Sequence, residues 1–153
     1  MISEGVGLPA DTTTPATLEP PRPDPDDLSR PFWDGLRQHR LLIQRCQGCG
    51  HYIHWPKPVC RFCLSTDLAA EEVSGRATLY SYTLVNQAFH PWYLEKLPYL
   101  LATVELEEQP KLMFFTRLTE CSEEDLRIGM PMEVVYEDAA PDLTFPLFRP
   151  AEQ

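Results

Sequence analysis

Two Cys-x2-Cys pairs constrain this chain more than any other feature of its sequence. The segment RCQGCGHYIHWPKPVCRFC, residues 45–63, holds both pairs, separated by ten residues. A Cys-x2-Cys turn brings its two sulfurs together, and two such turns can form a tetrahedral site of four sulfurs that suits Zn²⁺ or iron. Because four thiolates leave no open position for substrate or activated water, the spacing predicts a structural site rather than a catalytic one. The expected ligands are Cys46, Cys49, Cys60 and Cys63.

We expect one structural Zn²⁺ per chain, whose binding energy holds together a segment too small to fold alone. A rubredoxin-like redox iron is the first alternative, and redox-active cysteines or disulfides are the second. The fifth cysteine, Cys121, is solitary and has no assigned base. We therefore interpret Cys121 as a core or bystander residue rather than a nucleophile.

Length and composition limit the class of the protein. At 153 residues and 43% hydrophobic content, the chain can form one ordinary domain or two small modules that share an interface. The first residues include neither a basic nor an apolar signal region, and no stretch approaches the roughly 20 apolar residues of a membrane span. We therefore expect a cytoplasmic protein that does not bind membranes. In that compartment thiols stay reduced, which favours metal ligands or redox centres over disulfides.

Charge is distributed unevenly along the chain, whose formal net charge is −10. Residues 30–63 carry six basic side chains and one acidic, whereas residues 64–153 carry six basic and 16 acidic. A basic cysteine-rich segment therefore precedes a strongly acidic one. The basic surface is either simply solvated or faces an anionic ligand or partner.

The first 70 residues divide into a proline-rich tail, residues 1–27, and a helix with the cysteine-rich segment, residues 28–70. The tail contains six prolines and hardly any large apolar residues, so it is predicted to be disordered. Beyond it, SRPFWDGL predicts a short helix capped by Ser29 with a proline in its first turn. LLIQR predicts a strand that leads into the first cysteine pair. The helix aromatics Phe32 and Trp33 either pack as a local core or anchor a partner.

Residues 71–150 predict a small β-barrel. Strands are indicated by RATLYSYTLV, by YLLATVELEE and KLMFFTRLTE around a turn at EEQP, by MEVVYED, and by LTFPLFRP, which Pro146 is expected to break. CSEEDLRIG predicts one helical turn, capped by Ser122 and ended by Gly129. Five strands with a short helix between the third and the fourth form the element order of an OB-fold barrel.

The histidines give no clear catalytic signal. His51 and His54 lie in a short strand expected between the cysteine pairs, and with four sulfurs available we expect packing or surface roles for both; His39 is expected to be solvated. His90 lies in the loop NQAFHPWY, which either closes the barrel or forms a rim that contacts a ligand or partner. No GxGxxG, P-loop, GxSxG or HExxH motif occurs. The sequence therefore predicts no catalytic site in this chain.

An ordered set of motifs is more specific than the cysteine pairs alone. Between Pro31 and Pro150 the chain contains FWDGLRQHRLLIQRCQGCG, the second pair opening with PVC, GRATLYSYTLVNQAFHPWY, PYLLATVELEE, DLRIGMPMEVVYED and LTFPLFRP. This set resembles the acyl-CoA-associated zinc-ribbon/OB-fold proteins catalogued as domain-of-unknown-function family 35. The resemblance implies a mainly β fold, in which an N-terminal helix and a rubredoxin-like zinc ribbon precede a five-stranded OB-fold barrel. It also implies zinc on the four cysteines named above.

The same resemblance implies a function. Family members usually lack a catalytic site of their own and assemble with thiolase-fold enzymes (thiolases, hydroxymethylglutaryl-CoA synthase, steroid side-chain aldolases) or with hot-dog-fold enoyl-CoA hydratases. There they help to shape the acyl-CoA site, so we expect a non-catalytic subunit of a hetero-oligomer in lipid or steroid metabolism. On this basis the phosphates of coenzyme A would contact Arg37, Arg40, Arg45, Lys57 and Arg61. The pantetheine arm or the partner would contact Phe32, Trp33, Phe89, His90, Trp92 and Tyr93.

The main alternative is a nucleic-acid-binding protein, because zinc ribbons and OB-folds both serve that purpose. The acidic second half of the chain disfavours this alternative, since it would repel a phosphate backbone. A small rubredoxin-like electron carrier is a further possibility. An independent enzyme that uses His90 or Cys121 is the last, and turnover of acyl-CoA substrates by the pure chain would reveal it.

Overall fold

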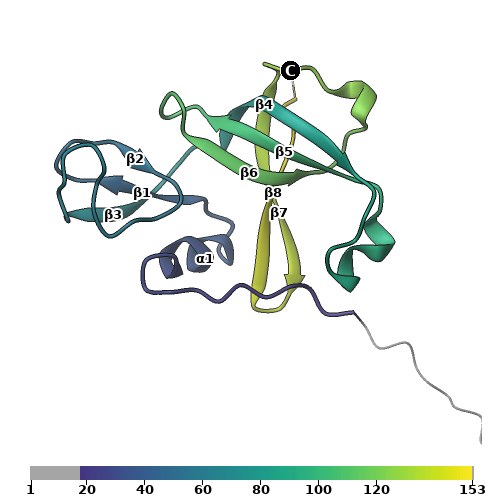
Figure 1. The fold of residues 1–153 in the computed structure, drawn as a ribbon, viewed down its shortest axis with the longest axis horizontal. Helices are drawn as coiled ribbons and strands as arrows, with labels where there is room; N and C mark the ends of the chain where they lie inside the picture. Colours follow the sequence, from purple (N-terminus) through teal and green to yellow (C-terminus); the bar gives the residue numbers. More distant parts are fainter. Residues whose placement is uncertain (1–17, 153) are drawn as a thin grey trace, which may run out of the picture.

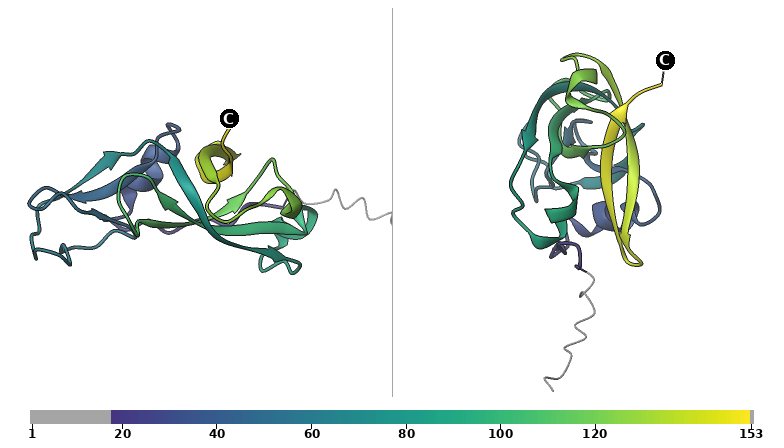
Figure 2. Two further views of the ribbon diagram at one scale, coloured as in Figure 1. Left: turned by 90° about the horizontal axis from the view of Figure 1, so that it is seen from above. Right: turned by 90° about the vertical axis from the view of Figure 1, so that its right-hand side faces the viewer.

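The computed structural model describes residues 18–152, which form a ribbon module joined to a β-barrel (Figure 1). Seen from above, the two lie side by side along the long axis of the molecule (Figure 2). No helix within the described part of the chain is long and apolar enough to cross a membrane. The elements in order are α1 (Arg30–Leu36), β1 (Leu42–Cys46), β2 (Tyr52–Ile53), β3 (Leu68–Glu72), β4 (Arg76–Val85), η1 (Pro91–Lys96), β5 (Tyr99–Leu106), β6 (Met113–Leu118), η2 (Glu123–Asp125), β7 (Pro131–Ala140) and β8 (Leu143–Pro150).

The ribbon module is a three-stranded antiparallel sheet in the order β2-β1-β3. Strand β1 is the predicted LLIQR strand, and its last residue, Cys46, is the first of the clustered cysteines. The sequence analysis did not identify β3, because LAAEE consists mostly of residues that are depleted in strands. The segment forms a strand because it pairs with β1, from Leu42 opposite Glu72 to Cys46 opposite Leu68.

The barrel is closed, with strand order β4-β5-β6-β8-β7 and β7 paired back to β4. This arrangement confirms the predicted five-stranded OB-fold. Helix η2 lies between the third and fourth barrel strands as predicted, where the Asp125 carboxylate accepts hydrogen bonds from the N–H and the hydroxyl of Ser122. The helix ends at Asp125, earlier than the predicted end at Gly129. Gly129 instead has φ of +87°, and its N–H donates to the Leu79 carbonyl.

Strand β8 corrects one prediction, because Pro146 does not break it. Pro146 lies opposite Tyr136 in the β7–β8 ladder, and its carbonyl accepts a hydrogen bond of 3.0 Å from the Thr116 hydroxyl on β6. The N–H and C=O of one strand residue face the same side. The missing N–H of Pro146 therefore faces β6 and removes nothing from the β7–β8 ladder.

The larger of two buried clusters runs through both modules. Phe32, Leu36, Leu41 and Ile43 from the first module belong to the same buried cluster as Phe148, Val104 and Leu106 of the barrel. Helix α1 contacts both β1 and β8, and a Cβ on Gly35 would lie 2.7 Å from the Leu42 side chain. The helix can therefore approach the sheet only with glycine at this position. Phe32 is 5% exposed and belongs to this buried cluster, as the local-core interpretation expected.

The proline-rich segment is described from Leu18 onward, and the predicted disorder of residues 1–17 lies outside the described residues. Residues 18–27 have no regular secondary structure but pass along α1 and the β7–β8 hairpin (Figure 1). There the Arg22 guanidinium pairs with Asp142 at 2.9 Å. Ser29 occupies the predicted N-cap position of α1 without a side-chain cap, because its hydroxyl bonds to Asp26 instead.

Candidate metal centre and interdomain cavity

The four predicted cysteine ligands converge, with all Sγ atoms within 4.8 Å of one another. The Sγ–Sγ distance is 3.5 Å between Cys46 and Cys63 and 3.6 Å between Cys49 and Cys60. In a tetrahedral site with metal–sulfur bonds of about 2.3 Å, neighbouring sulfurs lie about 3.8 Å apart. The donor set therefore fits one tetrahedral metal ion.

Two backbone turns position the sulfurs. In the first turn the Gly50 N–H donates to the Cys46 carbonyl at 2.8 Å, and Gly50 has φ of +77°. In the second turn the Leu64 N–H donates to the Cys60 carbonyl at 2.9 Å, with φ of +62° at Leu64. The left-handed conformation that glycine provides in the first turn is therefore taken by a leucine in the second.

The electrostatics of the cluster favour a bound cation when the four thiols ionise together. The backbone N–H of Cys49 is the main cause that lowers the pKa of Cys46 to about 6. The pKa of Cys63 is raised to about 12, because hydrogen bonds to the other three sulfurs and burial outweigh the lowering effect of the Ser65 N–H. Each thiolate therefore disfavours ionisation of the neighbouring thiols, and a bound cation is needed to stabilise four thiolates together.

His51 lies beside the cluster rather than in it. Its Nδ1 is 3.3 Å from Cys49 Sγ, and its ring stacks on Phe62 with centroids 4.0 Å apart. With four sulfurs in place, His51 is not required as a ligand.

His39, predicted to be solvated, is half exposed and pairs through Nε2 with Asp138 at 2.9 Å.

The predicted phosphate-binding cations separate into two groups. Arg37, Arg40 and Arg45 form ion pairs with Asp34, Glu72 and Glu71, so most of their charge is compensated. Lys57 and Arg61 have no carboxylate partner among residues 18–152. They line a small notch between the ribbon module and the β5–β6 turn.

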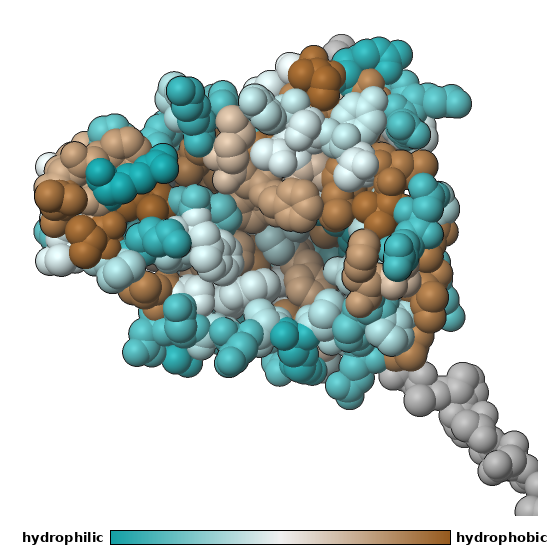
Figure 3. Space-filling view, viewed as in Figure 1, coloured by the Kyte–Doolittle hydropathy of each residue, from teal (hydrophilic) through white to brown (hydrophobic). Residues whose placement is uncertain are grey.

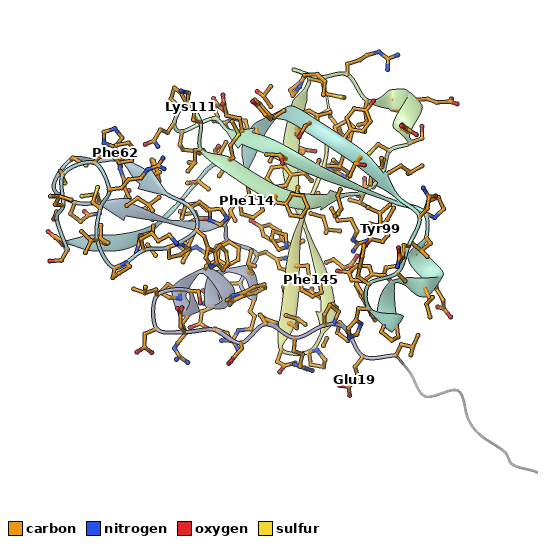
Figure 4. All side chains as sticks on the ribbon, viewed as in Figure 1. Glu19, Phe62, Tyr99, Lys111, Phe114 and Phe145 are labelled. Carbon is orange, nitrogen blue, oxygen red and sulfur yellow. The ribbon has the colours of Figure 1, made fainter. Side chains whose placement is uncertain are left out.

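A third cation, Lys111, completes this notch, which we call the basic notch and define by Lys57, Arg61 and Lys111. Within the described part of the chain, the Lys111 ammonium group has no carboxylate partner, although its backbone N–H donates to the Glu105 carboxylate at 3.1 Å. Figure 4 shows it on the β5–β6 turn, opposite Phe62 of the ribbon module. Sequence analysis missed Lys111 because it lies far along the chain, in the acidic half. A left-handed backbone with φ of +63° in the β5–β6 turn brings it to the notch.

The predicted aromatic rim is only partly assembled. Phe89 is 80% exposed, and His90 uses Nδ1 to accept the Trp92 N–H at the start of η1. Trp92 packs against Phe145 and under the Lys96 ammonium group, which lies 4.1 Å from its ring centroid. Tyr93 is the member of this loop that reaches a cavity.

That cavity lies between the two modules and has a volume of about 610 Å³. Figure 3 shows the same face hollowed between the ribbon module and the barrel, with hydrophobic residues inside the hollow. Most of its walls are aromatic, with α1 and the residues after β2 on one side and β5, β6 and β8 on the other. We call it the interdomain cavity; its lining residues are Phe32, Trp33, His54, Trp55, Tyr93, Leu101, Thr103, Met113, Phe114, Phe115, Thr116, Arg117, Phe145, Pro146 and Leu147.

His54 is the cavity residue whose role sequence analysis underestimated. Its ring stacks on Phe114 with centroids 4.8 Å apart and also contacts Phe32 and Trp55. Burial lowers the pKa of His54 to about 4, so the imidazole is neutral near pH 7. The sequence signal that existed was the cluster HYIHWP, which places His54 and Trp55 together.

Comparisons with known proteins match both modules. The family described as "ChsH2, rubredoxin-like zinc ribbon domain" matches residues 33–69, and "ChsH2, C-terminal OB-fold domain" matches residues 70–137. The chain is also 32% identical over 107 residues to a "DUF35 domain-containing scaffold protein" of Methanocaldococcus jannaschii. That alignment covers 68% of this chain and 73% of the archaeal protein.

Two further relatives carry enzyme names. A "Probable enoyl-CoA hydratase alpha subunit" of Thermomonospora curvata is 39% identical over 121 residues, which cover 78% of this chain and 37% of that protein. The chain therefore spans well under half the length of this relative. A solved structure named "Ltp2-ChsH2(DUF35) aldolase" superposes with a TM-score of 0.78 at 35% identity, covering 86% of this chain and 100% of that one.

Proposed function

Because this chain belongs to the DUF35 family of zinc-ribbon and OB-fold proteins, we propose that it is an accessory subunit of an acyl-CoA enzyme. The partner is a thiolase-fold enzyme or an enoyl-CoA hydratase, and this chain helps to form the partner's acyl-CoA site. The observation that carries the proposal is the match of both modules to the ChsH2(DUF35) chain of an aldolase. The hydratase name of the Thermomonospora relative supports the same class of substrate.

The metal in this proposal is Zn²⁺, held by Cys46, Cys49, Cys60 and Cys63. A closed S4 site supplies no Lewis-acid position for substrate, so the ion serves to fix the ribbon module. The ribbon's own buried cluster contains little beyond Cys46, Cys60 and Ile53. Metal binding therefore replaces the hydrophobic core that this module lacks.

The chemistry of the complex is assigned to the partner. Burial raises the pKa of Cys121, which disfavours the thiolate that a nucleophile needs. His90 engages its Nδ1 in the turn before Trp92. These two residues were the candidates for independent catalysis, and their environments favour structural roles.

The test of the proposed function is a pull-down of the tagged chain from its native cell at moderate salt, with mass spectrometry of the proteins that co-elute. We expect a thiolase-like or hydratase-like enzyme in stoichiometric amount. We also expect the purified chain alone to turn over no acyl-CoA substrate. Recovery of nucleic acid with its binding proteins, and of no such enzyme, would replace this proposal with the nucleic-acid alternative.

Within the shared site, we expect the phosphates of coenzyme A to lie at the basic notch. A coenzyme A phosphate can pair with the notch cations without displacing a protein carboxylate. The double substitution Lys57→Glu and Arg61→Glu should therefore weaken acyl-CoA binding by the assembled complex roughly ten-fold or more, since each exposed pair contributes about 1 kcal/mol. Isothermal titration calorimetry with acyl-CoA measures this change, and the loss should shrink as salt is raised.

Arg30→Glu provides the matched control for this experiment. Arg30 is exposed on α1, pairs with the fully solvated Asp27 and does not line the notch. The control changes net charge by the same amount per site but should leave acyl-CoA affinity within about two-fold. An equal loss of affinity per substituted site in the notch variant and in Arg30→Glu would mean that the notch has no specific role.

A further inference from the structure

The interdomain cavity has the chemistry of a site for an uncharged apolar group. Its volume of about 610 Å³ lies within the range of small-molecule pockets, roughly 300–1,000 Å³, and such pockets often form between domains. Its lining includes Phe32 and Trp33 of α1 together with Phe114 of β6 and Phe145 of β8, and the rings of Phe32 and Phe114 lie in contact, with centroids 6.1 Å apart. Figure 4 shows Phe114 and Phe145 on the part of the barrel that looks toward α1. Rigid aromatic walls of this kind bury apolar surface at a small entropic cost.

Two polar groups of the cavity lining are paired within the protein. The Arg117 guanidinium donates to the Glu137 carboxylate at 2.6 Å, which neutralises its charge. The Thr116 hydroxyl donates to the Pro146 carbonyl. Among the described residues, no hydrogen bond is found for the His54 ring, for the Tyr93 and Thr103 hydroxyls, or for the indole N–H groups of Trp33 and Trp55. A ligand atom inside the cavity therefore meets mostly apolar walls, together with a neutral imidazole and a few uncharged groups that can form hydrogen bonds with an uncharged polar atom.

The cavity and the basic notch share a wall. His54 and Trp55 line both of them, so the two recesses follow one another along the seam between the modules. One end of this seam carries three cations and the other end carries aromatic rings. The order matches a molecule with an anionic phosphate end, an uncharged middle and an apolar tail.

We infer that the interdomain cavity seats the apolar acyl group of an acyl thioester, so that this chain itself, and not only its enzyme partner, selects the acyl chain. The inference rests on the proposed function, because it places the acyl group of the substrate whose phosphates lie at the basic notch. The His54 imidazole contacts an uncharged polar atom of the bound thioester. Acyl groups with more apolar surface fill the cavity better and bind more tightly.

The test uses the full-length, metal-loaded chain and octanoyl-pantetheine, a thioester without phosphates that isolates the cavity from the notch. Isothermal titration calorimetry should detect binding of octanoyl-pantetheine, with affinity rising roughly four-fold for each methylene across a homologous series. Pantetheine alone should give no measurable binding. An affinity that does not change with acyl length would contradict the inference.

Two substitutions that obstruct the cavity have matched controls on strand β4. Thr103→Phe adds a ring at a cavity-lining position of β5, and should lower octanoyl-pantetheine affinity at least ten-fold. Thr78→Phe, at an exposed position whose ladder partners do not line the cavity, should not lower it. Phe115 is 67% exposed, so Phe115→Glu places a charge at the cavity with little risk to folding. It should also lower the affinity at least ten-fold, whereas Tyr80→Glu should leave it unchanged. Thermal melting identifies any variant that fails to fold.

The alternative occupant of the cavity is an apolar side chain of the enzyme partner. If octanoyl-pantetheine binds neither the free chain nor the assembled complex, and Thr103→Phe prevents assembly, the cavity is a protein interface and the inference is wrong. If the enzyme assembles normally and octanoyl-pantetheine does not bind, only this inference fails. If octanoyl-pantetheine binds but no acyl-CoA enzyme co-purifies, only the proposed accessory function fails.

Discussion

Cys46→Ser is expected to abolish tight metal binding and to unfold the ribbon module, leaving most of the protein insoluble. Cys46 is fully buried at the end of β1, where its sulfur lies among the other three sulfurs. Binding of Zn²⁺ to small cysteine-rich modules contributes about 10–16 kcal/mol, and this energy is the folding energy of such modules. The metal content measured by mass spectrometry should fall from one ion per chain to near zero. The soluble fraction and the β signal in circular dichroism should fall with it.

Cys121→Ser is the matched control, because Cys121 lies outside the cluster. This variant should remain soluble and keep one metal ion per chain. A Cys46→Ser protein that stayed folded, soluble and free of metal would show that the cluster does not hold the ribbon together. The absorption spectrum of the wild type decides the metal: a colourless protein carries zinc, and a red one carries iron.

The second large effect is a loss of stability between about pH 6.5 and pH 4 caused by His54. The unfolded chain binds a proton at His54 with a pKa near 6.5, whereas burial lowers the pKa in the folded state to about 4. Between these values the unfolded state binds more protons, so stability rises with pH and falls on acidification. The difference in the pKa of His54 between the unfolded and folded states corresponds to about 3 kcal/mol of unfolding free energy. This contribution to stability is fully lost below about pH 4. Urea denaturation at a series of pH values measures it.

His54→Phe keeps a ring against Phe114 and Phe32 but removes the titrating group. The variant should therefore lose less stability than the wild type over the same pH interval. The two proteins share every other titrating group, including Asp138, whose pKa is lowered by its hydrogen bond with His39, so the difference between the two curves isolates His54. Parallel curves would mean that His54 is solvated in the folded protein.

Local patterns in the sequence were enough to predict most of the fold. The five barrel strands and the η2 turn carry their own signals, because alternating apolar residues and a Ser–Asp cap act over a few positions. Strand β3 could not be predicted in this way, since its residues favour no strand and only the β1 edge orders them. The predicted break at Pro146 was wrong, because the stability cost of a proline in a strand depends on which side of the strand its missing N–H faces.

The candidate sites also differ in how far short-range sequence patterns predict them. The cysteine cluster was predictable because the ligand type and the spacing lie together in 18 consecutive residues, 46–63. The basic notch was half predicted: Lys57 and Arg61 are local to the ribbon, but Lys111 joins them only through the β5–β6 turn. The interdomain cavity was hardly predictable, since Phe115 and Thr103 appear in the sequence as outward positions of the barrel.

The sequence by itself determined the chemistry of the four-sulfur cluster, the order of the barrel strands and the family of the chain, because each depends on short-range spacing or on motif order. Only the tertiary structure decided which cations are free and which are paired, because that depends on the acidic residues that the folded chain places beside them. It also decided that Phe32 is largely buried and that Phe32, Trp33 and His54 together line a cavity. Those positions depend on how closely α1 packs against the barrel, a distance that Gly35 permits and that no local pattern encodes.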